Sequence, residues 1–176
     1  MRALPTPGAT AVGGPADAFE TALVEQGHRL ARLAFFLCGD RTRAEDVVAE
    51  AFAAAWPKWS SGRVDNLVPY LRRAVVNLAA KERRHRLVVF RHDERSVPAV
   101  PSPAADENLW ARLDLARTLA SLPAAQRVAV VLRYVEDMTE MDMASFLGVS
   151  PGTVKSRLAR ALDLMRARLE GGDDDA

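Results

Sequence analysis

Residues 139–162 read TEMDMASFLGVSPGTVKSRLARAL and carry the clearest local structural signals in the chain. Thr139, followed three residues later by Asp142, is typical of the capping box that starts a helix. Gly148 supplies the left-handed backbone that ends a helix, and Ser150-Pro151 places an N-cap and a first-turn proline at the start of the next one. The stretch therefore predicts two helices joined by a tight turn, which is the pattern of a helix-turn-helix.

The second of these helices carries its cations on one side. Val154, Leu158, Ala161 and Leu162 are expected to be buried. In helix-turn-helix proteins the start of this helix enters the major groove, where free N–H groups and the helix dipole favour phosphate. The residues that we expect to contact duplex DNA are Ser150, Pro151, Gly152, Thr153, Lys155, Ser156, Arg157 and Arg160. The alternative is a helical hairpin that only packs, with its cations as solvated surface residues.

The rest of the chain has helical periodicity as well. Between Ala44 and Trp56 the apolar residues recur at i, i+3, i+4, i+7 and i+8, a stripe that is expected to end at Pro57 with Trp56 in the core. Similar stripes span Phe19–Leu37, Leu67–Leu78, Trp110–Leu119 and Ala124–Val135. No window long enough to build a sheet alternates cleanly at period two. The fold class is therefore predicted to be all-α.

Two proline-rich segments organise the chain. Residues 1–16 are rich in Pro, Gly and Ala with nothing to bury, which predicts a disordered lead. Three prolines between residues 95 and 106 predict a semi-extended linker. The predicted order is a lead at 1–16, a helical domain at 17–90, a linker at 91–106, a second helical domain at 107–170 and an acidic tail at 171–176. Each domain is within the size range that folds alone.

The net charge of +1 averages over segments of opposite sign. Residues 72–95 hold eight Lys or Arg against three acidic residues, and residues 151–169 hold five against Asp163 alone. Two separated basic stretches on a near-neutral chain indicate two places where a polyanion can dock. Arg-rich helices can also be plain solvated surfaces, so the charge alone leaves both interpretations open.

Several function classes are excluded. No apolar stretch approaches the roughly 20 residues of a membrane span, and residues 1–15 lack the apolar block of a signal peptide. Cys38 is the single cysteine and the three His are scattered, so neither a disulfide framework nor a metal site is expected. With no nucleophile–base pair and no phosphate-cradling loop, we expect no enzyme, no cofactor and no small-molecule substrate.

Several stretches resemble the extracytoplasmic-function (group 4) sigma-70 factors. SPGTVKSRLARA at 150–161 looks like the family's promoter-reading helix, and the segments at 122–127 and 132–137 are similar to what precedes it. Residues 39–56 resemble the helix that grips RNA polymerase, and YLRRAVVNLA at 70–79 resembles the −10-reading helix. The motifs cover roughly residues 17–169 in the family's order. The resemblance implies a sigma2-like and a sigma4-like helical domain.

The resemblance also implies how the chain binds polymerase. In the family the second helix docks on the β′ clamp helices of core RNA polymerase, and the sigma4 domain sits on the β flap. The residues that it assigns to docking are Glu45, Asp46, Ala49, Glu50 and Phe52. Opposite charges would steer that encounter. Complementation of the helix dipole explains Glu45 and Asp46 without a partner, but it explains Glu50 poorly.

The loop before the third helix, and that helix, are assigned by the resemblance to the melted −10 element. A base there leaves the stack, so cationic and polar groups must offset the cost of unstacking. The assigned residues are Trp59, Arg63, Asn66, Arg72, Arg73, Asn77, Lys81 and Arg84. The spacing of Arg73, Asn77 and Lys81 at i, i+4 and i+8 predicts one cationic face. Trp59 suits a core position and a stacking platform equally.

The predicted function is that of a sigma factor with no chemistry of its own. It would bind core RNA polymerase and promoter DNA in the bacterial cytoplasm, at the nucleoid, reading the −35 element as duplex and the −10 element as single strand. Family members are often held by an anti-sigma protein, and nothing in this sequence specifies one. The alternative is a stand-alone helix-turn-helix regulator, which would normally dimerise on paired half-sites.

Because Met138, Met141 and Met143 replace the family's usual aliphatic residues, looser packing is expected there.

Overall fold

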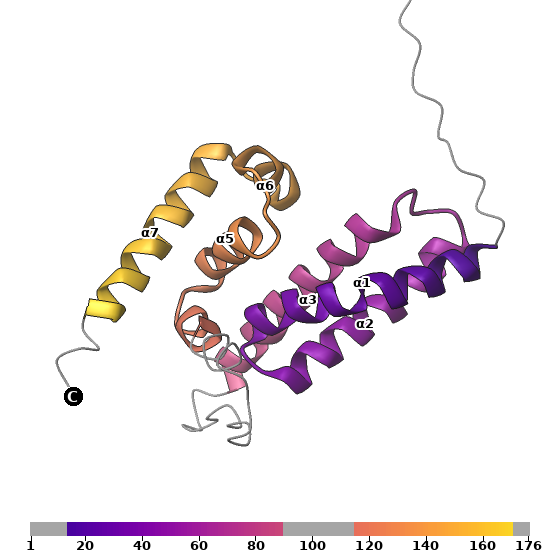
Figure 1. The fold of residues 1–176 in the computed structure, drawn as a ribbon, viewed down its shortest axis with the longest axis horizontal. Helices are drawn as coiled ribbons and strands as arrows, with labels where there is room; N and C mark the ends of the chain where they lie inside the picture. Colours follow the sequence, from indigo (N-terminus) through magenta and orange to yellow (C-terminus); the bar gives the residue numbers. More distant parts are fainter. Residues whose placement is uncertain (1–13, 90–114, 171–176) are drawn as a thin grey trace, which may run out of the picture.

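The structure is a computed structural model that describes residues 14–89 and 115–170, with side chains for all of these except 83–89 and 169–170. Within these ranges every regular element is a helix, which confirms the all-α prediction. Figure 1 shows two helical units side by side, the first coloured indigo to magenta and the second orange to yellow. Residues 1–13 of the predicted lead at 1–16, the linker at 91–106, the start of the helix at Trp110 and the acidic tail at 171–176 lie outside the described residues. The last two residues of that lead, 15 and 16, already belong to a helix.

The N-terminal unit is a bundle of three helices. They are α1 (Pro15–Cys38), α2 (Arg41–Ser60) and α3 (Leu67–Val89). Apolar stripes at helical spacing meet in its centre, where Leu33, Leu71 and Val75 are fully buried. Gly39 ends α1 at φ 75°, and the Asp40 carboxylate accepts the Arg43 N–H at 2.9 Å to start α2. A left-handed glycine followed directly by an N-cap gives the tight corner that places α2 antiparallel to α1.

Two local predictions for this unit are wrong. The helix α2 does not end at Pro57 but continues to Ser60. A proline so near a helix end removes one hydrogen bond of the last turn, so the helix tolerates it there. Trp56 is 40% exposed and is therefore not a core residue. Its ring packs edge-on against Phe19 at 5.0 Å between centroids, on the outside of the bundle.

The C-terminal unit contains the helix-turn-helix. After a helical turn at 115–120, the chain forms α5 (Ala124–Tyr134), α6 (Glu140–Leu147) and α7 (Pro151–Glu170). The predicted signals are confirmed: the Thr139 hydroxyl accepts the Asp142 N–H at 3.1 Å, Gly148 has φ 65°, and the Ser150 hydroxyl accepts the Thr153 N–H at 3.2 Å. Caps at both ends of the turn fix the angle between α6 and α7.

Packing of this unit differs from the prediction in two places. Met143 is fully buried, so the replacement of an aliphatic residue has not loosened the motif there. Leu162 is 37% exposed, whereas Val154 and Ala161 are fully buried. Eight residues along a helix advance about 80° beyond two whole turns, which moves Leu162 off the stripe that starts at Val154.

The two units meet through a buried arginine. Arg127 on α5 is 3% exposed, and its guanidinium donates to Leu37 O of α1 and to Leu119 O, each at 2.6 Å, and also to Ala120 O. These oxygens belong to the carboxyl ends of two helices, which carry the negative end of the dipole. One side chain thus caps a helix end from each unit.

Candidate nucleic-acid and polymerase interfaces

The N-terminal half of α7 presents free cations to solvent. The hydroxyls of Ser150, Thr153 and Ser156 are occupied in capping and backbone contacts within the turn. Lys155 and Arg160 are exposed and Arg157 is half-buried. Within the described part of the chain no hydrogen bond or ion pair engages any of these three cations. The predicted −35 residues therefore lie along the N-terminal half of α7 with their positive charge uncompensated. Arg157 and Arg160 share one side of the helix, and Lys155 lies about 140–160° around the helix from them.

Gly152 and Pro151 are exposed at the start of that helix. A Cβ atom added at Gly152 would meet only the Ser150 hydroxyl, at 3.9 Å. The glycine is therefore not required by crowding inside the protein. A bare backbone at a helix start instead allows a phosphate to approach the free N–H groups closely.

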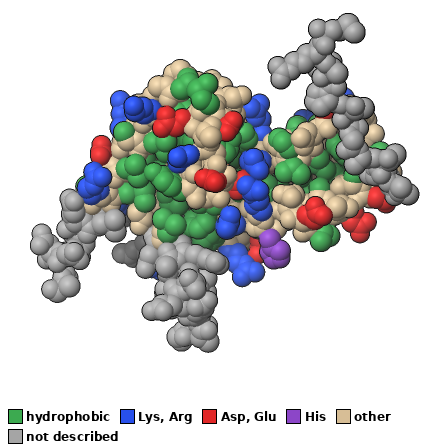
Figure 2. All heavy atoms as spheres, turned by 45° about the horizontal axis from the view of Figure 1, so that its top comes forward, with side chains coloured by type: hydrophobic (Ala, Val, Ile, Leu, Met, Phe, Trp, Pro, Cys, Tyr) green, Lys and Arg blue, Asp and Glu red, His purple; other side chains and the backbone are tan. Residues whose placement is uncertain are grey.

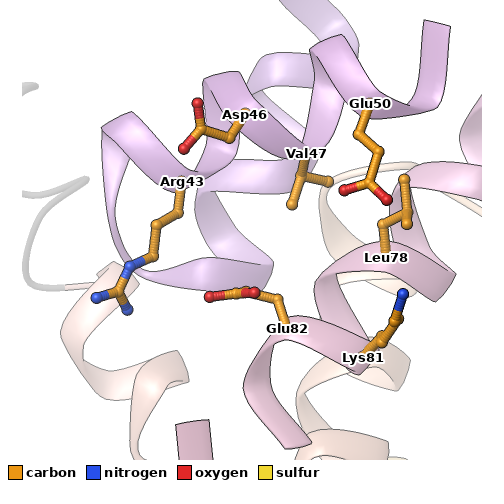
Figure 3. Close-up of a pocket in the computed structure, with 7 residues that line it drawn as sticks. All are labelled: Arg43, Asp46, Val47, Glu50, Leu78, Lys81 and Glu82. Atoms are coloured by element: carbon orange, nitrogen blue, oxygen red, sulfur yellow. The ribbon is translucent and has the colours of Figure 1, made fainter. Parts of the chain in front are cut away.

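The acidic residues of α2 differ in their surroundings. Glu45 is paired with Arg41 at 2.8 Å on the surface. Asp46 and Glu50 are exposed and carry no hydrogen bond or ion pair within residues 14–89 and 115–170. Figure 3 shows both carboxylates beside a hollow of ≈ 340 Å³ whose other wall is α3. Two uncompensated carboxylates one turn apart form a surface suited to a basic partner.

The two other predicted docking residues lie apart from that hollow. Ala49 is exposed between the acidic side chains. Phe52 is 5% exposed and packs edge-on against Phe19 at 5.7 Å. Its ring belongs to the core of the bundle and offers no surface to a partner.

The last turn of α2 and the loop that precedes α3 carry three of the predicted −10 residues. Arg63 and Asn66 are exposed, and the Arg63 Nε donates to the Ser61 hydroxyl at 3.0 Å. Trp59 is half-buried, and its Nε1 donates to Pro15 O at 2.8 Å. The indole thus fastens the end of α2 to the start of α1 while part of the ring remains accessible.

The cationic residues of α3 do not form one face. Arg72 and Arg73 contact the C-terminal unit, and Asn77 lines a hollow of ≈ 290 Å³ between α3 and the turn of the helix-turn-helix. Lys81 instead lines the hollow beside Glu50 (Figure 3). Each step of four residues overshoots a full turn by about 40°, so the predicted row has rotated onto a second surface by Lys81. The side chain of Arg84 lies outside the described residues.

Four further side chains that join the units were not singled out by the sequence analysis. These are Arg29, Arg32, Arg127 and Glu136. The contacts that they make between the units join residues 64 to 107 positions apart in the chain, so no helical spacing relates them. Glu136 lies just beyond the carboxyl end of α5, where an acidic residue opposes the helix dipole. That local mismatch is the one feature that could have pointed to a cationic partner.

Cys38 is a packing residue. Burial, with a further contribution from Glu82, raises the pKa of Cys38 to about 12. The thiol is therefore neutral at physiological pH and unreactive as a nucleophile. Among the described residues no cluster of His, Cys, Asp or Glu is suited to a metal ion, and no helix is long and apolar enough to cross a bilayer.

A helix-turn-helix with an uncompensated basic helix, joined to a helical bundle with exposed acidic residues, is typical of a two-domain DNA-binding protein. Comparison with known proteins identifies the family. Residues 23–87 match sigma-70 region 2, and residues 112–165 match sigma-70 region 4. The RNA polymerase sigma-E factor of Streptomyces coelicolor is 35% identical over 159 residues, which are 90% of this chain and 89% of that protein. SigL, an ECF sigma factor of Mycobacterium tuberculosis, is 33% identical over 79% of this chain and 81% of its own length.

Two solved structures share the arrangement of helices. The sigma factor RpoE of Bartonella quintana, in complex with the anti-sigma factor NepR, has a TM-score of 0.67 at 26% identity, covering 91% of this chain and 99% of that one. CnrH, in complex with the cytosolic domain of CnrY, shares the fold with a TM-score of 0.65 at 24% identity, covering 92% of this chain and 91% of that one.

The chain belongs to the extracytoplasmic-function sigma-70 family. It is an RNA polymerase sigma factor that binds core polymerase and directs promoter-specific transcription initiation. As a member of this family it has no enzymatic activity of its own. The alternative of a helix-turn-helix regulator that never contacts polymerase does not agree with this result.

Proposed function

We propose that the two units divide promoter reading between them. The observation that carries the proposal is the uncompensated cationic surface at the start of α7, set on a capped helix-turn-helix. This unit reads the −35 element as duplex while sitting on the β flap. The N-terminal unit holds the β′ clamp helices and captures the −10 strand. The factor acts in the cytoplasm, at the nucleoid.

The −35 contact rests on charge and on helix geometry together. Lys155, Arg157 and Arg160 lose no internal ion pair when they bind phosphate, because none engages them in the described structure. The free N–H groups of the first turn add the positive end of the dipole. Arginine and lysine can also reach guanine edges in the major groove. The remaining −35 residues, Ser150, Pro151, Gly152, Thr153 and Ser156, fix how closely the backbone approaches.

The first test is the double variant Arg157→Ala/Arg160→Ala. If both side chains contact duplex phosphates, log Kobs should depend on log salt with a slope shallower by about 1.8, since each contact releases roughly 0.9 counterion. Duplex selected from a promoter library is titrated at several salt concentrations by fluorescence anisotropy. Arg166→Ala/Arg168→Ala, which removes two exposed cations further along α7, is the matched control. A slope equal to that of the wild type contradicts the assignment.

For polymerase docking we propose Asp46 and Glu50 as the main contacts, with Ala49 between them and Glu45 at the edge. Charge reversal, Asp46→Lys/Glu50→Lys, should abolish co-purification with core polymerase, since both carboxylates would become cations facing a basic partner. Glu20→Lys/Glu25→Lys makes the same change on exposed positions of α1 and should leave co-purification intact. Retention of the Asp46/Glu50 variant by core polymerase at the wild-type level would discard the docking site.

For the −10 strand we propose the loop residues Trp59, Arg63 and Asn66, and the α3 residues Arg72, Arg73 and Asn77 with Lys81 and Arg84 at the far end. The relative RpoE is held by an anti-sigma factor, which supports the same kind of partner for this chain.

In-vitro transcription with core polymerase over a promoter library tests the whole function. Absence of promoter-directed transcripts with the intact chain would overturn it.

A further inference from the structure

The surface where the two units meet is unusually rich in arginine. Figure 2 shows Lys and Arg side chains gathered in a band between the two halves of the molecule. Four of them reach from the N-terminal unit to the C-terminal one. They are Arg29 and Arg32 on α1, and Arg72 and Arg73 on α3. Two of these four, Arg72 and Arg73, are residues that we assign to the −10 strand.

The C-terminal unit meets these arginines with negative groups only. The carboxylate of Glu136, whose side chain is 1% exposed, lies 2.9 Å from Arg72 Nε and 3.2 Å from Arg29 Nη2. The Arg32 Nη2 donates to Val135 O at 3.4 Å. The Arg73 Nη2 donates to Phe146 O at 2.8 Å, and its guanidinium lies over the Phe146 ring. Val135 and Phe146 lie at the carboxyl ends of α5 and α6, where unpaired carbonyls concentrate negative charge.

These acceptors occupy the arginines in the way that DNA phosphates would. A carboxylate and rows of helix-end carbonyls are anionic or electronegative oxygens, the same chemistry that a nucleic-acid backbone offers to a guanidinium. Arg72 is 21% exposed when paired with Glu136. Arg72 is therefore largely covered while the units stay together. Arg73 has an exposed side chain, but its guanidinium is engaged by the end of α6, so a single strand must displace these contacts to bind both residues. The face of α7 lies on the far side of the C-terminal unit from α1–α3 (Figure 1), so the duplex-reading surface remains open.

We propose that the C-terminal unit masks the −10 surface of the free protein, with Glu136 as the latch that the −10 strand must displace. The inference rests on the proposed function of Arg72 and Arg73. It makes the free factor able to bind duplex DNA through α7 but poorly able to bind a single strand. Opening of the junction then raises single-strand affinity, because the apparent Kd equals the intrinsic Kd divided by the open fraction.

The latch is suited to release. The Glu136 Oε2 accepts no well-aligned hydrogen bond, and the Arg29 Nε donates to Glu136 Oε1 only at the long distance of 3.5 Å, so the attraction to the two arginines is mainly that of an ion pair. Arg29 remains 46% exposed, which leaves one side of the pair accessible to water. Separation of the units returns these charged groups to solvent, which offsets part of the lost attraction.

The test uses the full chain and two variants of the latch, Glu136→Gln and Arg29→Gln. Each has a matched control that makes the same charge change on an exposed residue away from the junction. Glu140→Gln serves the first variant and Arg41→Gln the second. The Arg29 variant is decisive, because loss of a cation alone should weaken DNA binding, whereas release of the latch should strengthen it.

Two quantities are measured for every variant. The distance between the units is measured by pulsed electron paramagnetic resonance. Nitroxide labels are attached at Glu25→Cys and Asp163→Cys in a Cys38→Ser background, and circular dichroism checks that each labelled variant keeps its helicity. Affinity is measured by anisotropy for a mixed-sequence oligonucleotide of about 12 nucleotides, as single strand and as duplex. Mixed sequence suffices because phosphate contacts carry no sequence information.

We expect both latch variants to raise the open fraction on the order of tenfold, which corresponds to about 1.4 kcal/mol. The apparent Kd for the single strand should fall by the same factor, and the Kd for the duplex should stay at the control value. An unchanged separation, or a wild type that is already open, overturns the inference. An opened junction with single-strand affinity no better than that of the controls overturns the masking role. Failure of the wild type to direct transcription with core polymerase, by contrast, counts against the proposed function and leaves the closure result standing.

Discussion

Replacement of Arg127 by Met should destabilise the protein more than any surface substitution. The guanidinium holds three backbone carbonyls at short range, those of Leu37, Leu119 and Ala120, and a fourth, that of Leu122, at 3.4 Å, and Arg127 is 3% exposed. A buried acceptor that loses its donor costs about 1–3 kcal/mol. Carbonyls at helix ends offset part of that loss by accepting hydrogen bonds from water. The variant also no longer buries a charged group, whose desolvation destabilises the folded state. The net loss should therefore be about 3 kcal/mol.

Urea unfolding followed by circular dichroism measures this loss. With an m-value of about 2 kcal/mol/M, the midpoint of Arg127→Met should fall by about 1.5 M. Arg127→Lys should lie between it and the wild type, because an ammonium keeps the charge but not the fork of donors that reaches three oxygens. Arg166→Met, at an exposed site with one ion pair at 3.4 Å, should move the midpoint little. If the Arg127 and Arg166 variants unfold alike, the guanidinium does not hold these helix ends.

The remaining predictions concern single positions in the two units. Gly148→Ala should lower the free energy of unfolding by about 1–2 kcal/mol, because φ is 65° there. Gly27→Ala, inside α1 with open space around it, should raise the free energy of unfolding by about 0.5–1 kcal/mol. Equal effects of the two substitutions in thermal unfolding would contradict the left-handed backbone at Gly148. Cys38 should react with iodoacetamide roughly a thousandfold more slowly in the folded chain than an exposed cysteine at the same pH below 9, because its pKa is raised from 9.0 to about 12. The thiolate fraction then grows only as pH rises toward 12. The rate of reaction with iodoacetamide should therefore keep increasing above pH 9 in the folded protein, while in urea it should level off. A plateau near pH 9 in the folded protein would refute the burial of the thiol.

How well the sequence predicted each part depended on whether the determining contacts were local. The caps at Thr139, Gly148 and Ser150 involve residues three apart or a single backbone angle, so their signals stand in the sequence and the structure agrees with them. The same holds for the exposed cations of α7. The exposure of Phe52 and Trp56 could not be predicted in this way. Both lie on the apolar stripe of α2, and only the position of α1 decides which of them is covered.

Side chains that act between units were beyond prediction from one sequence. Arg73 has helical spacing to Asn77 and Lys81, which predicted a single surface, yet the partner of Arg73 is the end of α6, more than 70 residues away. Arg72 carries the same ambiguity, since nothing in its neighbourhood distinguishes a phosphate ligand from the partner of Glu136. The arginine-rich composition left polyanion binding and a solvated surface both open, and in the structure Arg72 and Arg73 are engaged by acceptors of the C-terminal unit.

The chemistry of the junction also explains how it can be both specific and reversible. Apart from Arg127, its contacts place half-exposed arginines on carbonyls and a single carboxylate, groups that water solvates well when they separate. On opening, Arg127 loses only the Leu37 carbonyl and keeps Leu119 and Ala120 within its own unit. An interface built from large apolar side chains would expose them on separation, at a cost of about 25 cal/mol for each Å². The contacts of helix ends and arginines avoid that cost, whereas the apolar core, which continues from one unit into the other, must be divided when the units separate.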